Sequence, residues 1–179
     1  MTQVDIPGPV ASDFEGAVAL SGEEFDALLA EAGTDEERAV VESSAIGLRM
    51  VQIAESQRGV RESGGEDRGV PWERYVRPFG VGPAPWCAFF VSWCYWQTTT
   101  QRPPWSNPGY VPSVYAWAQA AGRLTRAPQR GDMFGTGGAH MGLVSARLRD
   151  GQILSIEGNW GDAVMAVRRP ISAHWFATP

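Results

Sequence analysis

The chain has 179 residues, of which 44% are apolar and 20% charged, and a net charge of −5 at neutral pH. Length and composition are typical of one globular domain, and no run approaches the roughly 18 apolar residues that a membrane-spanning helix needs. We therefore expect no membrane insertion. The two cysteines have no metal-ligand spacing, which argues against a zinc site or a disulfide framework.

Charge is distributed unevenly along the chain. Residues 1–45 carry eleven acidic side chains and one arginine, a net charge of −10, whereas residues 46–179 carry +5. We interpret the first segment as an acidic helical region for targeting or carrier docking, and the second as the main domain. The net positive charge of residues 46–179 suits binding to an anionic polymer such as cell wall or nucleic acid. No basic run or aromatic-interleaved patch supports nucleic-acid binding specifically.

The N-terminus lacks the basic start and apolar core of a cleaved signal peptide. We therefore expect synthesis in the cytoplasm and, for a protein acting outside it, another delivery route.

Two helices are predicted in the first third of the chain. Ser21-Gly22-Glu23-Glu24 is a capping-box pattern, which predicts a short helix that ends at Gly33. Thr34-Asp35-Glu36-Glu37 is a second such pattern, and it predicts a longer helix that ends at Gly59.

An apolar run that opens at Cys87 predicts a buried helix. It follows a long loop rich in glycine and proline (residues 59–85), and its apolar residues recur at helical spacing through Gln97. Unpaired N–H groups and the positive end of the helix dipole favour a thiolate at the helix start. Cys94, deeper in the same helix, is expected to be a core residue and to lie too far away for a disulfide. A core role is also the commoner one for any lone cysteine, so Cys87 needs support from other residues.

The chain beyond Met133 is predicted to form strands. A helix that begins at Pro112 or Ser113 and ends at Ala121 comes first. Arg149-Asp150-Gly151 is a hairpin signal between two of the strands. The predicted strands are 133–134, 141–148, 152–157, 164–168 and 175–176. Helices followed by an antiparallel sheet indicate an α+β fold.

A thiol nucleophile needs a base within hydrogen-bond reach and a third group that holds the base. His140 opens a strand among small residues that leave room for a substrate, whereas His174 is expected to pack or cap the last strand. A turn centred on Asp150 places Glu157 and Asn159 on the face of His140, with Asn159 the nearer. Structural alternatives remain: a packed histidine at a strand start, and an ordinary strand end at which Gly-Asn forms a turn.

Four blocks of this sequence, in this order, resemble the CHAP domain, the cysteine- and histidine-dependent amidohydrolase/peptidase branch of the papain-like NlpC/P60 superfamily. They are Pro-Trp-Cys-Ala-Phe-Phe-Val-Ser-Trp (residues 85–93), Pro-Gln-Arg-Gly-Asp-Met-Phe (128–134), His-Met-Gly-Leu-Val (140–144) and Ile-Glu-Gly-Asn (156–159). The resemblance covers residues 46–179, and Trp86 before the cysteine favours the CHAP branch. It implies a papain-like fold, with N-terminal helices packed on a small antiparallel sheet.

The resemblance also implies roles for single residues. Cys87 is the nucleophile, His140 the base, and Glu157 and Asn159 are polar partners, with the orienting role given to Glu157. The strand count instead places Asn159 nearer to the histidine, and a β-bulge or a strong twist of the strands would reconcile the two. Some family members bind calcium through acidic residues just before the cysteine. Residues 77–86 contain no acidic residue, so we expect no metal or other cofactor.

The implied reaction is hydrolysis of an amide bond in peptidoglycan through a cysteine acyl-enzyme. The enzyme would be an N-acetylmuramoyl-L-alanine amidase or an endopeptidase of the peptide stem or cross-bridge. Four tryptophans in or near loops are candidates for substrate binding: Trp72, Trp86, Trp105 and Trp160.

Such an enzyme would act at the cell wall after holin- or injection-type delivery, as a phage lysin or an injected effector. Peptidoglycan is the expected partner, with room for an immunity protein or a secretion or injection carrier. Two other classes stay open: a catalytically inactive CHAP fold that binds the wall or serves a structural role, and a cysteine acyltransferase or deamidase that acts on protein.

Overall fold

The structure, a computed structural model, describes residues 16–39 and 45–179 of the chain. Its centre is a seven-stranded antiparallel sheet in the order β1-β6-β5-β4-β3-β7-β2. The strands are β1 (Val18–Leu20), β2 (Leu124–Thr125), β3 (Met133–Thr136), β4 (His140–Arg147), β5 (Gln152–Trp160), β6 (Ala163–Pro170) and β7 (Trp175–Ala177). The predicted α+β class is confirmed.

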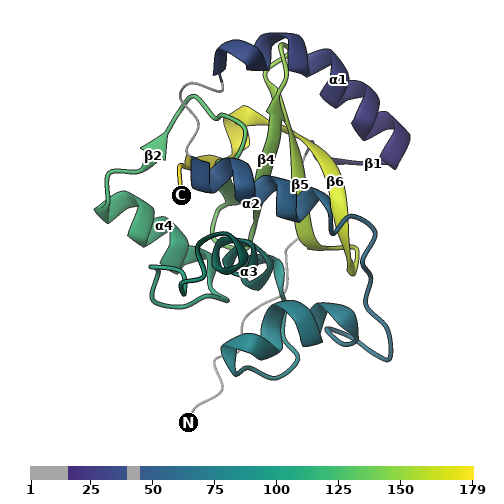
Figure 1. The fold of residues 1–179 in the computed structure, drawn as a ribbon, viewed down its shortest axis with the longest axis vertical. Helices are drawn as coiled ribbons and strands as arrows, with labels where there is room; N and C mark the ends of the chain where they lie inside the picture. The colour runs from purple at the N-terminus through teal and green to yellow at the C-terminus, as the bar shows by residue number, and fades with distance from the viewer. Residues whose placement is uncertain (1–15, 40–44) are drawn as a thin grey trace.

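Helices cover one face of this sheet and one of its ends (Figure 1). They are α1 (Gly22–Ala39), α2 (Ala45–Glu55), α3 (Cys87–Thr99) and α4 (Val111–Ala120), with single turns at Trp72–Val76, Arg77–Phe79 and Ile171–Ala173. Helices α2 and α3 pack on β4 and β5, while α1 lies across the end of the sheet at which β4 turns into β5. Within the described residues, no helix is both long and apolar enough to cross a membrane.

Helix α3 is buried around most of its circumference, which its near-continuous apolar sequence requires. It reaches β5 directly because position 158 is a glycine: a Cβ atom added to Gly158 would lie 2.6 Å from Phe90 Cβ and 2.9 Å from the Trp86 ring. This close approach holds the N-terminus of α3, and therefore Cys87, against the end of the sheet where β4 starts and β5 ends.

The predicted elements agree with the structure except near the N-terminus. The five strands predicted beyond Met133 all form, and the helices predicted from Cys87 and from Pro112 or Ser113 correspond to α3 and α4. The capping box at Ser21 is confirmed, since Ser21 N donates to Glu24 Oε2 at 2.8 Å and Glu24 N to Ser21 Oγ at 3.2 Å.

The predicted boundaries of both helices in this region are wrong. The first helix does not end at Gly33 but continues to Ala39, because one glycine costs a helix only about 1 kcal/mol relative to alanine. The second helix was expected to run from Thr34 to Gly59, whereas α2 covers Ala45–Glu55. Residues 40–44 lie outside the described residues.

Residues 16–39, which we call the arm, are part of the same folded unit as the rest of the described chain. Strand β1 pairs with the edge of β6. Phe25 on α1 is 1% exposed, and the Arg58 guanidinium lies 4.6 Å from the centre of its ring and 3.1 Å from Asp26. The boundary predicted at residue 45 therefore does not separate two folded units here. A targeting or docking role for residues 1–45 stays a prediction.

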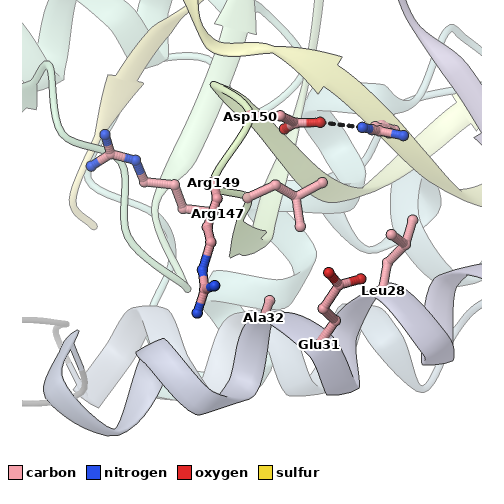
Figure 2. A pocket seen from close by; sticks show the side chains of 8 residues that line it. Leu28, Glu31, Ala32, Arg147, Arg149 and Asp150 are labelled. Atoms are coloured by element: carbon pink, nitrogen blue, oxygen red, sulfur yellow. Dashed lines mark hydrogen bonds and ion pairs between the residues drawn. The ribbon is translucent and has the colours of Figure 1, made fainter.

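Helix α1 is less tightly packed where it faces the turn between β4 and β5. A cavity of about 180 Å³ lies between α1 and the β4–β5 turn (Figure 2). Leu28, Glu31 and Ala32 line it from α1, and the turn contributes Asp150, which is paired with Arg168 of β6. Phe25 is therefore the main anchor of the arm.

We expect Phe25→Ala to lower the free energy of unfolding by about 3 to 5 kcal/mol, because a buried aromatic side chain is replaced by a cavity. Val18→Ala, in the same arm but 56% exposed, is the matched control and should change that free energy by about 0.5 kcal/mol or less. Urea unfolding of both variants measures the difference. Equal, small effects would mean that the arm does not contribute to the core.

Candidate active site

Cys87 is the first residue of α3, with Trp86 at the N-cap position. No side chain caps this helix end, so N–H groups of the first turn remain available around the thiol. The side chain is 8% exposed, and its Sγ lies 4.0 Å from the carbonyl oxygen of Ala139, the residue that precedes β4. The thiol is therefore held between a helix N-terminus and the start of a strand.

His140, the first residue of β4, connects the thiol to a buried carboxylate. Its Nε2 lies 2.7 Å from Glu157 Oε2, which leaves Nδ1 as the ring nitrogen that faces its other partner, Cys87. Burial alone would lower the pKa of His140, but the hydrogen bonds to Cys87 and Glu157, and the charges of both groups, raise that pKa to about 9. The imidazolium form is therefore favoured at neutral pH.

A β-bulge in β4 brings the carboxyl end of β5 closer to the histidine than the sequence count predicts. Val144 pairs with Ser155 and Ala146 with Leu154, so Ser145 is an extra residue in β4. The sequence count assumed no bulge and placed Glu157 two same-face steps from the position opposite His140. In the structure Arg147 pairs with Ile153 and, beyond the bulge, Leu143 pairs with Ile156, so the turn and the bulge together shift the register by two residues relative to that count. Glu157 then lies one same-face step from the position opposite His140, and its side chain spans this step, with Oε2 2.7 Å from His140 Nε2. The structure therefore places the carboxylate of Glu157 next to His140, and its orienting role stays a prediction.

Asn159 lies at a second irregularity, between β5 and β6. Its φ is 61°, a left-handed conformation, and the β5–β6 register shifts between Glu157 and Trp160. Its side chain hydrogen-bonds to Asp67, in the loop before the cysteine helix. The expectation that Asn159 is the nearer partner of His140 is therefore not what the structure shows, because the backbone turns at Gly158-Asn159.

The carboxylate of Glu157 is fully buried and held from several sides. Arg169 Nε donates to Oε1 at 2.6 Å and Arg169 Nη2 to Oε2 at 2.7 Å, while Ser155 Oγ donates to Oε1 at 2.6 Å. Burial by itself would raise the pKa of Glu157, but the hydrogen bonds from Arg169 and His140, together with their charges, lower it to about 2. Glu157 is therefore a permanent anion next to the imidazolium.

Sequence reasoning missed Arg169 and Ser155. Arg168 and Arg169 are neighbours in β6, and strand alternation says only that one of them faces the interior. Arg169 is fully buried, whereas Arg168 is partly exposed. A serine in an apolar strand carries no signal of its own.

The four predicted tryptophans have different surroundings. Trp160 is half-buried beside the site, with its ring centre 6.0 Å from that of His140 in an edge-to-face arrangement. Trp72 is half-buried in the loop before the helix, and its Nε1 donates to the Val81 carbonyl at 3.2 Å. Trp160 is therefore the tryptophan best placed to contact a substrate at the thiol.

Trp86 and Trp105 are corrected to packing residues. Trp86 is fully buried, stacks on Tyr75 and donates from Nε1 to Glu62 Oε1 at 2.7 Å. Trp105 is 3% exposed and donates to Ser92 Oγ at 2.9 Å. Neighbouring side chains cover the Trp86 and Trp105 rings, so neither ring has an exposed face for a sugar or a peptide.

His174 packs against the last strand, as predicted. Its ring lies between Phe134, at 5.4 Å, and Phe176, at 6.4 Å, measured between ring centres. Neither of its ring nitrogens has a hydrogen-bond partner among the described residues. Burial and the charge of Arg169 lower the pKa of His174 to about 4, which keeps the ring neutral.

The loop beside Trp86 gives the site an acidic border. Glu62, which accepts the Trp86 bond, also accepts one from Asp67 N at 2.6 Å. Burial and the charges of Glu62, Glu66 and Asp162 raise the pKa of Asp67 to about 6. An open depression of about 500 Å³ is lined here by Arg61, Glu62, Ser63, Gly65, Glu66 and Asp162. In the described residues, no group of three or more His, Cys, Asp or Glu side chains is arranged to hold a metal ion.

Comparison with protein-family models and with curated proteins finds no match for this chain.

Proposed function

We propose that this protein is a cysteine-dependent amidohydrolase or peptidase of the papain-like CHAP type, and that it cleaves an amide bond in peptidoglycan. The observation that carries the proposal is the chain of contacts from the Cys87 thiol through the His140 imidazole to the Glu157 carboxylate. A thiol at a helix N-terminus, an imidazole with a raised pKa and a buried anion behind it are the three parts that covalent cysteine catalysis requires.

In the first half of the proposed reaction, the Cys87 thiolate attacks the carbonyl carbon of the amide. The tetrahedral oxyanion that forms lies next to the N-terminus of α3, where the Cys87 N–H is one available donor. The His140 imidazolium gives its Nδ1 proton to the amide nitrogen, the C–N bond breaks, and the amine leaves. A thioester between Cys87 and the acyl group remains.

In the second half, neutral His140 takes a proton from water, and the resulting hydroxide attacks the thioester carbonyl. The C–S bond breaks, the carboxylic acid product leaves, and the Cys87 thiolate and His140 imidazolium are restored. Glu157 stays ionised throughout: it turns the ring and stabilises the imidazolium without accepting the proton.

The substrate class rests on different support from the chemistry. The catalytic residues lie within four blocks that resemble CHAP domains, and the half-buried Trp160 ring beside His140 suits contact with a sugar or a peptide stem. A cell-wall polymer is the substrate that both features favour, and the protein would then act at the wall.

Digestion of purified sacculi tests this proposal. We expect the protein to release soluble muropeptides, and mass spectrometry of these fragments should show one type of new amine and carboxyl end, which identifies the bond that is cut. Cys87→Ala, tested at equal concentration, is the matched control and should release none. Intact sacculi, together with ammonia release or acyl transfer on a protein substrate, would instead support a deamidase or an acyltransferase.

A further inference from the structure

Arg169 lies directly behind the proposed catalytic pair, on the far side of Glu157 from His140. We propose that Arg169 is a positioning residue: it holds Glu157 as an ionised carboxylate turned toward His140, and thereby lets Cys87 react as a thiolate at neutral pH. The inference rests on the cysteine chemistry proposed above and extends it to a residue that never touches the substrate.

The guanidinium of Arg169 contacts the Glu157 carboxylate and two aromatic rings. Its Nε and Nη2 contact the two oxygens of Glu157 at 2.6 and 2.7 Å, a two-point contact that sets the rotation of the carboxylate. Its Cζ lies 4.7 Å from the centre of the Trp160 ring and 5.5 Å from that of Phe134. Hydrogen bonds along one edge and two aromatic rings beside the guanidinium restrict the position of the side chain.

The position of Arg169 determines the orientation of the carboxylate that contacts the histidine. Glu157 Oε2 is shared between Arg169 Nη2 and His140 Nε2, both at 2.7 Å. The rotation that Arg169 imposes on the carboxylate is therefore the rotation that aims Oε2 at the imidazole. A lysine supplies the charge but only a point contact, so it does not set this rotation in the same way.

The charge of Arg169 has a second effect on the thiol. A buried carboxylate without a cation takes up a proton, and a neutral carboxylic acid no longer stabilises the imidazolium. Loss of the ionised carboxylate moves formation of the reactive thiolate to higher pH, and Arg169 prevents this loss.

The alternative is that Arg169 only stabilises the interior of the sheet. A structural role of this kind would lower the amount of folded protein but would leave the pH dependence of the thiol unchanged. The pH dependence therefore separates the two roles.

Alkylation of Cys87 by iodoacetamide provides the measurement, since it reports the thiolate without any peptidoglycan. The rate constant is measured from about pH 4 to about pH 10 in a Cys94→Ala background, which leaves a single thiol. We expect Arg169→Met to move the midpoint of this profile upward by about one pH unit or more, with similar rates at the alkaline end. Arg169→Lys, which retains the charge, should lie between the parent and Arg169→Met. An unchanged midpoint in folded Arg169→Met would overturn the proposal.

A double-mutant comparison tests whether Arg169 acts through Glu157. In a Glu157→Gln background, adding Arg169→Met should move the midpoint no further, and an additional full shift would show an independent effect and refute the proposal. The double variant contains no unpaired buried charge and is expected to fold. If Arg169→Met alone does not fold, Arg169→Gln carries the same expectation, because its amide keeps one donor for Glu157 and removes only the charge and the two-point contact.

The outcome is independent of the substrate. If the parent protein leaves sacculi intact, yet Arg169→Met shows the predicted shift in the alkylation profile, peptidoglycan cleavage is refuted and the role of Arg169 is supported. Sacculus hydrolysis with no shift in Arg169→Met would do the reverse.

Discussion

Cys87→Ala should reduce the rate of sacculus hydrolysis by at least about a thousandfold while the protein remains folded, because it removes the nucleophile and only one sulfur atom. His140→Ala should cause a loss of similar size. The double variant should be no worse than either single variant, since a nucleophile and its base act as a unit. Initial rates of muropeptide release, with circular dichroism to check folding, measure all three.

Cys94→Ala is the matched control for this prediction. Cys94 is fully buried seven positions further along the same helix, and burial raises the pKa of its thiol well above the ordinary value. The variant should keep its activity and lose only about 1 kcal/mol of stability. Equal loss of activity in Cys87→Ala and Cys94→Ala would show that the helix, and not the thiol at its start, is what hydrolysis requires.

Glu157→Gln should affect both activity and stability. The amide cannot stabilise the imidazolium as a carboxylate does, so we expect hydrolysis to fall by about a hundredfold to ten-thousandfold. The same change leaves the buried Arg169 guanidinium without its counter-charge, which should lower the free energy of unfolding by about 3 to 5 kcal/mol. Rates at saturating substrate and urea unfolding measure the two effects separately.

Asn159→Gly is the control at the neighbouring polar position. Asn159 has a φ of 61°, and glycine adopts this conformation without strain, so the variant removes the side chain and leaves the backbone unchanged. We expect activity near that of the parent. If Asn159→Gly proved the more damaging of the two changes, Asn159 and not Glu157 would be the functional partner of His140.

The shifted pKa values also predict how stability depends on pH. Glu157 has a lowered pKa in the folded protein, so its contribution is present above its ordinary value of 4.5 and is lost as the pH falls toward about 2. His140 has a raised pKa, so its contribution is present below its ordinary value of 6.5 and is lost as the pH rises through about 9. In Glu157→Gln, the melting temperature should therefore depend less on pH than in the parent, both at acid and at alkaline pH.

The residues of the site could be predicted from sequence because each one follows a local rule. Cys87 opens a run with helical apolar spacing, His140 follows a glycine-rich turn, and a hairpin signal at Asp150 brings the next strand back beside it. These rules require only neighbouring residues, so they place Cys87 at the start of a helix and His140 at the start of a strand, as the structure has them.

The register between β4 and β5 could not be predicted, because residues distant in sequence stabilise the bulge in β4. The bulged residue Ser145 has its carbonyl bonded by Arg130 Nη1 at 2.7 Å, and its hydroxyl donates to Glu55 Oε1 at 2.8 Å. Arg130 also forms a two-point ion pair with Glu55. A count along one hairpin contains neither Glu55 nor Arg130, so it misses the extra residue that they stabilise.

The pairing of β1 with β6 has a consequence for how the chain folds. The hairpins β3–β4, β4–β5 and β5–β6 join strands that are neighbours in sequence, whereas β1 pairs with a strand near the other end of the described chain. Such a long-range contact closes slowly and, we expect, last. Until it closes, the N–H and C=O groups along the edge of β6 are free to pair with a strand of another molecule. The three residues of β1 thus cover this edge only in the fully folded protein, and the exposure of the edge ends when the arm docks.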